Sequence, residues 1–430
     1  MQTEGIRMIR EIADLREILH NRKLSLDELR SLQDAKLRAL IAHAWERVPY
    51  YQSLFRSAGL SPNDIRTIDE LKRIPITAKE DINRAGLENT IAKGISPAAC
   101  HRIVTSGSTG TPLTVYLTPQ DLRIRRLLEF RSLLSIGFRP SDRLSVLGPE
   151  PPHATRFHQR LGFYRSENIS ALLPIEEQIR RLNKMRPTVF WAYPTVLRAL
   201  LHQIYSGIRN IINPRILITS AECIDDILKD RIRSIWNDIE MFDFYGTAEV
   251  GRIALECPAH QGLHVNADHI ILELLEDYPP AESGKRGGVA VTVLNAFAMP
   301  FIRYRLGDIS VWIDSHCSCG SSFPLIRPVQ GREDEMIQLP SGKLLSPFGL
   351  LFILRRFHEI DQFRFIQKNP GQLEILLAVR EGLQQDFIPR IKADCLHYLK
   401  EPIHLEIAIV PFIEVNGKFK TFTNLNNPAP

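Results

Sequence analysis

Residues 215–244 read RILITSAECIDDILKDRIRSIWNDIEMFDF, and this stretch indicates the fold class. Arg215–Thr219 is a short apolar run of strand length, and Asp225–Trp236 carries apolar residues at helical spacing. Glu240–Phe244 is a second short strand. A strand, a helix and another strand in succession are typical of α/β proteins whose sheets are largely parallel.

The same alternation precedes this stretch, and a different pattern follows it. Further strand-like and helix-like runs occur upstream: Arg143–Leu147, Ile175–Met185, Thr188–Tyr193 and Val196–Ser206. From about Ala254 strands follow one another with few helices between them: His269–Leu275, Val289–Leu294 and Ser310–Ile313. This second pattern predicts an antiparallel sheet or barrel. Roughly the first 75 residues are predicted to be helical.

The polar run Gly331–Asp334 is the predicted boundary of a small C-terminal unit. Beyond it lie three strand-like and two helix-like runs: Phe363–Gln367, Leu373–Ala378, Leu405–Val410, Pro347–His358 and Gln384–Leu399. We therefore expect an α/β protein with a large N-terminal domain, residues 1–331, of α/β sheets plus a barrel-like β subdomain. A small mobile α/β domain, residues 332–430, is expected to follow.

The composition is ordinary for a folded protein, with 44% hydrophobic and 24% charged residues. The 54 Lys and Arg residues are interleaved with 49 Asp and Glu, so the chain lacks the clustered basic footprint of a nucleic-acid-binding protein. No run approaches the roughly 18–20 apolar residues of a membrane span, and residues 1–15 lack an apolar signal core. We expect a cytoplasmic protein.

A loop rich in glycine and hydroxyl groups follows the apolar pair Ile103–Val104. Its predicted phosphate-binding residues are Thr105, Ser106, Gly107, Ser108, Thr109 and Gly110. Backbone N–H groups in such a loop can turn inward around a phosphate chain, and the hydroxyl groups add donors. The Gly-Lys-Ser/Thr ending of a Walker loop is missing, which disfavours a P-loop ATPase. The loop alone also fits a flexible surface turn.

Two further polar strings lie at the ends of predicted strands. In Asp243–Glu249, DFYGTAE, a strand runs into a tight turn, where Tyr245 could cover a purine and Glu249 could hold Mg²⁺. In Arg303–Asp308, RYRLGD, the carboxylate of Asp308 could accept both ribose hydroxyls. Each string alone also fits an ordinary turn.

Taken in order, and followed by Gly331–Asp334 and Gly417–Lys418, these strings resemble the adenylate-forming superfamily of acyl-CoA synthetases, nonribosomal adenylation domains and luciferases. Three more strings resemble its branch of phenylacetate–CoA ligase-like and capsule-associated ligases: AWERVPYY at Ala44–Tyr51, TSAE at Thr219–Glu222 and MPFIRYR at Met299–Arg305. The resemblance covers nearly the whole chain. One departure is Thr111, where many relatives have a lysine that adds positive charge near the phosphates.

The resemblance implies nucleotide-binding roles for residues across the N-terminal domain. Thr105 to Gly110 would hold the ATP phosphates, and Asp308 would bind the ribose. Arg332 would steady the ribose or a phosphate. The adenine pocket and its adjoining turn would comprise Ser220, Ala221, Glu222, Phe244, Tyr245 and Gly246.

The resemblance also implies catalytic roles for Thr247, Glu249 and Lys418. Thr247 would touch the α-phosphate and the acyl carboxylate, and Glu249 would ligate Mg²⁺. Lys418, delivered by the closing small domain, would offset the negative charge that builds on the α-phosphate, with Lys420 as the alternative. Asp334 matches the hinge about which the small domain rotates.

Cysteine and histidine residues in two separated segments offer metal ligands: Cys257, His260, His264, Cys317 and Cys319. Three thiolates and one imidazole make a tetrahedral zinc set, and such a closed set is structural rather than catalytic. Similar sets in relatives of this branch support the prediction. Only one histidine is needed; we favour His264 because His260 is close in sequence to Cys257, but either fits.

The predicted function is an acid–coenzyme A ligase that uses ATP and Mg²⁺ to form an acyl-adenylate from a small carboxylic acid, releasing AMP and pyrophosphate. Transfer of the acyl group to an amine or carrier is the alternative that keeps the first half-reaction. A non-catalytic nucleotide-binding protein is the alternative of another class. The acid itself is not readable: aromatic residues between Phe130 and Phe163 could shape a pocket for an aryl acid, but they fit a hydrophobic core equally well. The resemblance also allows a homodimer.

Overall fold

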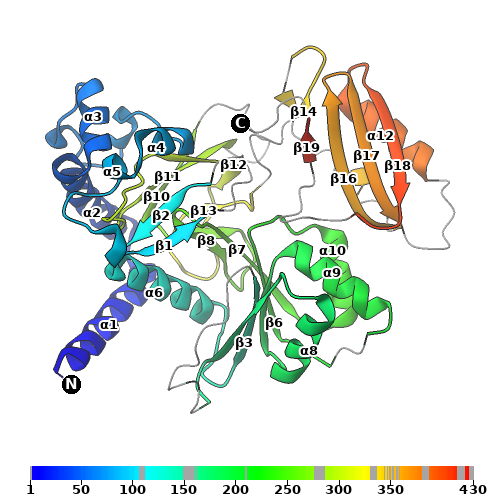
Figure 1. Cartoon of the computed structure of the whole chain (residues 1–430), viewed down its shortest axis with the longest axis horizontal. Coiled ribbons are helices and arrows are strands. Elements are labelled where there is room, and N and C mark those ends of the chain that lie inside the picture. Colours follow the sequence, from blue (N-terminus) through cyan, green and yellow to red (C-terminus); the bar gives the residue numbers. More distant parts are fainter. Residues whose placement is uncertain are drawn as a thin grey trace. The chain divides into compact units, whose positions relative to one another are not determined.

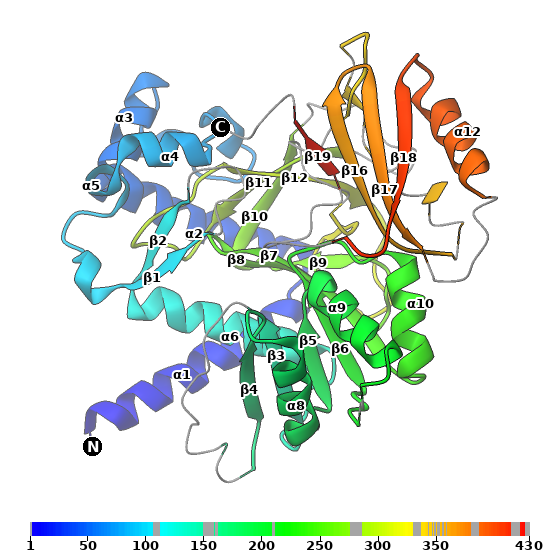
Figure 2. The same ribbon diagram turned by 45° about the vertical axis from the view of Figure 1, so that its right-hand side comes forward.

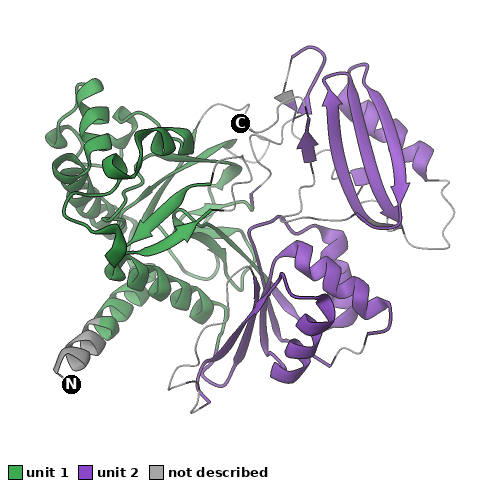
Figure 3. Ribbon diagram, viewed as in Figure 1, with its two compact units in different colours: residues 1–138, 242–328 green, residues 139–241, 329–430 purple. Residues whose placement is uncertain are grey.

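The computed structural model describes residues 2–105, 112–148, 159, 162–208, 211–275, 286–329, 337–342, 344–345, 347, 350, 353–354, 357, 359–379, 387–413 and 422–425. The chain forms two compact units, each made of two segments (Figure 3). Unit 1 comprises residues 1–138 and 242–328, and unit 2 comprises residues 139–241 and 329–430.

Unit 1 begins with three helices, α1 (Gln2–His20), α2 (Leu26–Arg47) and α3 (Pro49–Ser57). Ser25 and Glu28 form a capping box that starts α2. Pro49 ends α2 but also occupies the first turn of α3, where its missing N–H costs nothing. The buried face of α2 and α3 packs into one apolar cluster with Ile302. The shorter helices are η1 (Asn21–Lys23), η2 (Pro62–Asp64), η3 (Leu71–Arg73), α4 (Lys79–Ala85), α5 (Leu87–Thr90) and η4 (Pro97–Ala99).

The main sheet of unit 1 is antiparallel throughout, in the order β10-β11-β12-β13-β9-β8-β7 (Figure 1). Its strands are β7 (Glu240–Thr247), β8 (Gly251–Glu256), β9 (Leu263–Val265), β10 (Ile270–Leu275), β11 (Arg286–Val293), β12 (Tyr304–Ile313) and β13 (Leu325–Ile326). A separate hairpin of β1 (His101–Val104) and β2 (Thr114–Leu117) precedes helix α6 (Pro119–Ser135). The prediction of antiparallel strands after Ala254 is confirmed.

The first segment of unit 2 is a parallel sheet in the order β6-β5-β3-β4. Its strands are β3 (Arg143–Gly148), β4 (Arg165–Ser170), β5 (Val189–Ala192) and β6 (Ile216–Ser220). Helices α8 (Ile175–Met185), α9 (Pro194–Tyr205) and α10 (Asp226–Ile235) lie along this sheet in both views (Figures 1 and 2). Their apolar faces share one buried cluster with Phe190 and Trp236. The predicted strand–helix alternation is confirmed.

The second segment of unit 2 has a core of its own, built around Phe365 and Ile375. Four strands in the order β18-β17-β16-β19 form its sheet: β16 (Ile360–Asn369), β17 (Gln372–Val379), β18 (His404–Val410) and β19 (Phe422–Asn424). Helix α12 (Ile388–Leu399) packs beside β18, and β14 (Ile337–Gln338) pairs with β15 (Leu344–Leu345). The expected α/β class is confirmed, and the boundary at residues 331/332 lies outside the described residues. Among the described helices, none is long and apolar enough to cross a membrane.

Candidate functional site

The loop predicted to hold phosphates connects strands β1 and β2. Thr105 and Leu113, which flank the loop, are hydrogen-bonded to each other. The backbone N–H of Thr105 donates to the carbonyl oxygen of Leu113 at 3.0 Å. The backbone N–H of Leu113 in turn donates to Oγ1 of Thr105 at 2.9 Å. Thr105 is buried, so its hydroxyl is committed to closing the hairpin. Ser106, Gly107, Ser108, Thr109 and Gly110 lie outside the described residues.

The predicted Thr247 and Glu249 lie in a tight turn between antiparallel strands β7 and β8, where Thr247 pairs with Gly251. Two glycines permit this turn. A Cβ on Gly246 would lie 2.5 Å from the carbonyl oxygen of Gly251, and Gly251 itself has a left-handed φ of +83°. The side chains of Thr247 and Glu249 are half-buried. The turn therefore presents one hydroxyl and one carboxylate at the end of two paired strands.

Tyr245 joins this turn to the second predicted motif. Its hydroxyl donates to Oδ2 of Asp308 at 2.7 Å, and both side chains are buried. Asp308 lies on β12, directly after Gly307, whose φ is +76°. Two strings more than 60 residues apart in sequence are thus held together by one hydrogen bond. Phe244, by contrast, is fully buried beneath the guanidinium of Arg252, 4.8 Å from its ring centroid, so we assign it to packing.

Arg303, in the same string as Asp308, has a structural role. Its guanidinium forms a bidentate ion pair with Glu273 at 2.9–3.1 Å and donates to the carbonyl oxygens of Lys72 and Ile74. Its backbone φ of +49° is left-handed, which is unusual for a residue with a side chain. These contacts anchor the start of β12 to the N-terminal segment and so hold Asp308 in place.

Three of the predicted adenine-pocket residues, Ser220, Ala221 and Glu222, lie in unit 2 at the carboxyl end of β6, where open α/β sheets bind ligands. Oγ of Ser220 accepts a 2.8 Å hydrogen bond from the indole N–H of Trp191. Ala221 has a left-handed φ of +68°. The carboxylate of Glu222 accepts from both the backbone N–H and the hydroxyl of Thr195, in the first turn of α9. Glu222 therefore caps a helix and fixes the turn.

Four of the five predicted metal ligands come together in unit 1. One ligand atom from each of Cys257, His264, Cys317 and Cys319 lies within 4.8 Å of the others. The Sγ atoms of Cys257 and Cys317 are 3.5 Å apart, and Sγ of Cys319 lies 3.3 Å from Nε2 of His264. Nδ1 of His264 lies 3.0 Å from the carbonyl oxygen of Phe323. That hydrogen bond selects the tautomer whose Nε2 lone pair is available to a metal.

His260, the other predicted candidate, lies apart from this cluster. Its Nδ1 is 3.0 Å from Oε1 of Glu256, and its ring stacks on Phe242 with centroids 5.1 Å apart. Both contacts fix the imidazole on the surface of β8, and its side chain is 45% exposed. The structure therefore offers His264, and not His260, as the nitrogen ligand.

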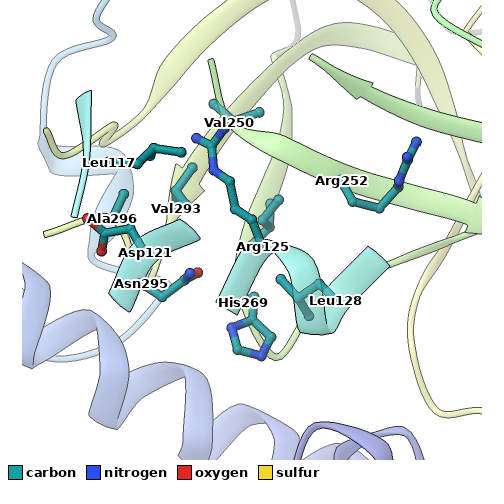
Figure 4. A pocket seen from close by; sticks show the side chains of 11 residues that line it. Leu117, Asp121, Arg125, Leu128, Val250, Arg252, His269, Val293, Asn295 and Ala296 are labelled. Atoms are coloured by element: carbon teal, nitrogen blue, oxygen red, sulfur yellow. The ribbon is translucent and has the colours of Figure 1, made fainter. Parts of the chain in front are cut away.

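A cavity of about 10 Å³ lies between α6 and the sheet of unit 1 (Figure 4). It is lined by Asp121, Arg125, Arg252, His269, Asn295 and apolar neighbours. Its size fits about one water molecule, which is too small for an acyl group. Arg125 was not predicted from the sequence, because a single arginine in a helical segment carries no motif. Arg332, Asp334 and Lys418 lie outside the described residues.

Comparisons with known proteins agree with this architecture. No family model matches the chain. The phenylacetate–coenzyme A ligase of Thermus thermophilus is 27% identical over 415 residues, which is 89% of this chain and 90% of that protein. The fumarate–(S)-2,3-diaminopropanoate ligase of Enterobacter agglomerans is 23% identical over 274 residues, 61% of this chain and 65% of that protein.

Among solved structures, a 2-hydroxyisobutyryl-CoA ligase in complex with its acyl-adenylate matches with a TM-score of 0.80 at 18% identity. The match covers 94% of this chain and 91% of that ligase. At this identity the structural match shows the shared fold. The chain is thus similar to phenylacetate–coenzyme A ligases over most of its length, and it shares the fold of a ligase that forms an acyl-adenylate.

Proposed function

We propose that this chain is an ATP-dependent acid–coenzyme A ligase. In the first half-reaction a carboxylate oxygen attacks the α-phosphorus of ATP and pyrophosphate leaves; in the second the thiol of coenzyme A attacks the acyl-adenylate and AMP leaves. The observation that carries the proposal is the hydrogen bond between Tyr245 and Asp308, which joins the two predicted nucleotide-binding motifs. The names of the sequence relatives support coenzyme A as the acceptor.

The residues present fit the groups that such a ligase uses. Glu249 offers a half-buried carboxylate at the tip of a rigid turn, and carboxylate oxygens suit Mg²⁺. Mg²⁺ would supply charge neutralisation for the phosphates. Thr247, two residues earlier, would donate its hydroxyl to the α-phosphate, and Asp308 would accept from the ribose. Lys418 is the proposed source of the positive charge in the adenylation step.

The first test measures pyrophosphate release from ATP and Mg²⁺ across a panel of carboxylic acids, with and without coenzyme A. An aryl acid heads the panel because of the relatives' names. We expect release that requires an acid and turns over only with coenzyme A, together with AMP as the nucleotide product. Formation of ADP, or no release with any acid, would overturn the proposal in favour of another ATP chemistry or a non-catalytic nucleotide-binding protein.

An amine or a carrier is the second candidate acceptor. The observation that favours an amine is the match to the fumarate–(S)-2,3-diaminopropanoate ligase, whose name pairs an acid with an amine. This candidate shares the adenylation step and differs only in the second half-reaction. A single burst of pyrophosphate that coenzyme A does not change, but that an added amine converts to turnover, would select it.

We further propose a structural zinc ion at Cys257, His264, Cys317 and Cys319, which we name the knuckle cluster. Three sulfur atoms and one nitrogen at mutual distances within 4.8 Å suit a tetrahedral ion with Zn–S bonds of about 2.3 Å. Cys257, His264 and Cys317 are buried, which leaves the set closed to substrate. The ion would tie the loop carrying Cys317 and Cys319 to strands β8 and β9.

Elemental analysis of the purified protein tests the zinc proposal. We expect one zinc per chain, and a lower melting temperature after removal with a strong chelator. Cys319→Ser should lose the metal, whereas Cys100→Ser, which alters a cysteine outside the cluster, should keep it. Metal-free protein that melts at the same temperature as untreated protein would contradict a structural role.

We also propose that the protein is cytoplasmic and that it can form a homodimer. Light scattering of the purified protein would test the homodimer.

A further inference from the structure

Helix α6 contacts the turn that carries Glu249 through the side chain of Arg125. Arg125, in the second turn of α6, donates from Nη1 to the carbonyl oxygen of Ala248 at 3.0 Å. Its Nη2 donates to the carbonyl oxygen of Glu249 itself. Figure 4 shows the side chain extending from the helix towards Val250. One planar guanidinium thus spans two consecutive carbonyl groups of a turn only a few residues long.

The turn is shaped to receive this side chain. Gly251 ends the turn with a φ of +83°, and a Cβ at that position would lie 3.4 Å from Cδ and Nε of Arg125. The absence of a side chain at Gly251 therefore lets the arginine stem pass against the backbone. Burial lowers the pKa of Arg125 to about 10, and the nearby Asp121 and Glu249 oppose that shift, so the guanidinium stays charged at neutral pH.

Helix α6 is itself fixed at both ends. Thr118 and Asp121 form a capping box at its start. Arg131, near its other end, is locked by an ion pair with the fully buried Asp268. The helix can therefore act as a rigid support, and Arg125 transmits its position to the turn through two charge-assisted hydrogen bonds.

We propose that Arg125 is a positioning residue for the adenylation site: it holds the backbone of Ala248 and Glu249 so that the Glu249 carboxylate is pre-organised for the Mg²⁺ that accompanies ATP. The inference rests on the proposed function, because it takes Glu249 as a ligand of that ion. Arg125 acts through Glu249, since both of its terminal nitrogens face the turn. Positioning of a metal ligand by a supporting residue is typically worth 10–100-fold in metal affinity or activity.

The backbone effect is tested first, without any ligand. Hydrogen–deuterium exchange is compared for the unmodified protein, Arg125→Met, Arg125→Lys and the control Arg126→Met, which alters an exposed neighbour on the same helix. We expect faster exchange in peptides covering residues 246–252 in Arg125→Met, an intermediate rate in Arg125→Lys, and no change in Arg126→Met. Unchanged exchange in Arg125→Met would show that the two hydrogen bonds do not hold the turn.

The metal effect is tested next, by Mn²⁺ binding in the presence of a non-hydrolysable ATP analogue and by the Mg²⁺ dependence of pyrophosphate release. We expect Arg125→Met to raise the half-saturating metal concentration by about tenfold or more, and Arg125→Lys to recover part of the loss. A purely structural role would lower the active fraction and leave half-saturation unchanged, so unchanged half-saturation overturns the inference. If the unmodified protein shows no acid-dependent release of pyrophosphate, the proposed function has failed. The exchange experiment still tests whether Arg125 holds the turn at Ala248 and Glu249.

Discussion

A buried charge network in unit 1 is the most consequential feature at the scale of single residues. The side chains of Arg131 and Asp268 are 1% and 0% exposed, and their ion pair is 2.7 Å long. Arg131 also donates to the carbonyl oxygen of Ile18 and to Oδ1 of Asn266. Asn21 donates to Asp268. The network therefore ties the N-terminal helices to α6 and to the loop before β10.

Breaking this pair should be costly, because one charge would stay buried without its partner. We expect Arg131→Met to lower the free energy of unfolding by about 3–5 kcal/mol. Urea unfolding followed by circular dichroism would measure the loss, with the exposed Arg126→Met as the matched control. A loss below about 1 kcal/mol, the range of surface pairs, would show that water reaches Asp268 in the variant.

The same network predicts acid sensitivity. Burial lowers the pKa of His269, although the adjacent Asp268, 3.3 Å away, opposes this; Lys36 and Arg131 reinforce it. Burial raises the pKa of Asp268, but His269 and Arg131 lower it by more, so the net pKa is depressed. Asp121, Arg125 and Arg252 are the other charged residues that line the cavity beside His269. A depressed pKa means stability that is present above the unfolded-state pKa and lost as the pH falls.

We therefore expect the melting temperature to fall as the pH drops from about 7 to 5, because His269 titrates near 6.5 in the unfolded chain and the contribution of Asp268 follows below about 4. His269→Gln should reduce the decrease between about pH 7 and 5. Thermal unfolding across this pH range would measure both slopes. Equal slopes for the variant and the unmodified protein would mean that other groups govern the acid response.

Residues within motifs were predictable and residues that support them were not. Tyr245 and Asp308 were predicted as site residues from the order of several strings along the chain, but the hydrogen bond between them could not be predicted. Arg125 and Arg131 lie in a helix with two other arginines, and nothing in the spacing of the four separates a buried cation from a solvated one. The resemblance suggested Phe244 for the base, yet its ring is covered by Arg252.

At the scale of elements, long periodic segments were predictable and short pairings were not. The parallel strands β3, β5 and β6 and their helices match the predicted runs closely, since each repeats a clear apolar pattern. β13 has only two residues and β9 three, which is too short for any periodicity to show. Their pairing nevertheless places His264 opposite Leu325, close to the cysteines of the knuckle cluster.

The turn after β6 gives a prediction at this scale. Ala221 adopts a left-handed φ of +68°, which a β-branched side chain tolerates poorly. Ala221→Val should lower the free energy of unfolding by about 1–2 kcal/mol, whereas Ala221→Gly should be neutral or mildly stabilising. Urea unfolding of both variants would be compared with Ala393→Val on the exposed face of α12. Equal stability of Ala221→Val and Ala221→Gly would show that the turn relaxes to another conformation.

At the scale of the whole molecule, the C-terminal segment is organised as a module. Its sheet encloses a core of its own, with Phe365, Ile375 and Leu377 fully buried. The side-chain amide of Gln367, also fully buried, pairs with the backbone N–H and carbonyl of Gln338 and so attaches β14 to this module. The predicted domain boundary at residues 331–334 lies outside the described residues and stays a prediction. A self-contained core is what a domain that moves as one body requires.

In the proposed mechanism, Lys418 of the C-terminal segment acts in the first half-reaction, adenylation, and not in the second. We expect Lys418→Ala to slow adenylation by about 10²–10³-fold, because the developing charge on the α-phosphate loses its partner. ATP affinity should change little, and transfer from a chemically prepared acyl-adenylate to coenzyme A should be retained. Rapid-quench assays of each half-reaction, with Lys420→Ala as the matched control, would measure this. A larger loss of adenylation in Lys420→Ala than in Lys418→Ala would assign the catalytic role to Lys420. Equal losses of both half-reactions in Lys418→Ala would show that Lys418 supports the fold of the C-terminal segment rather than one chemical step.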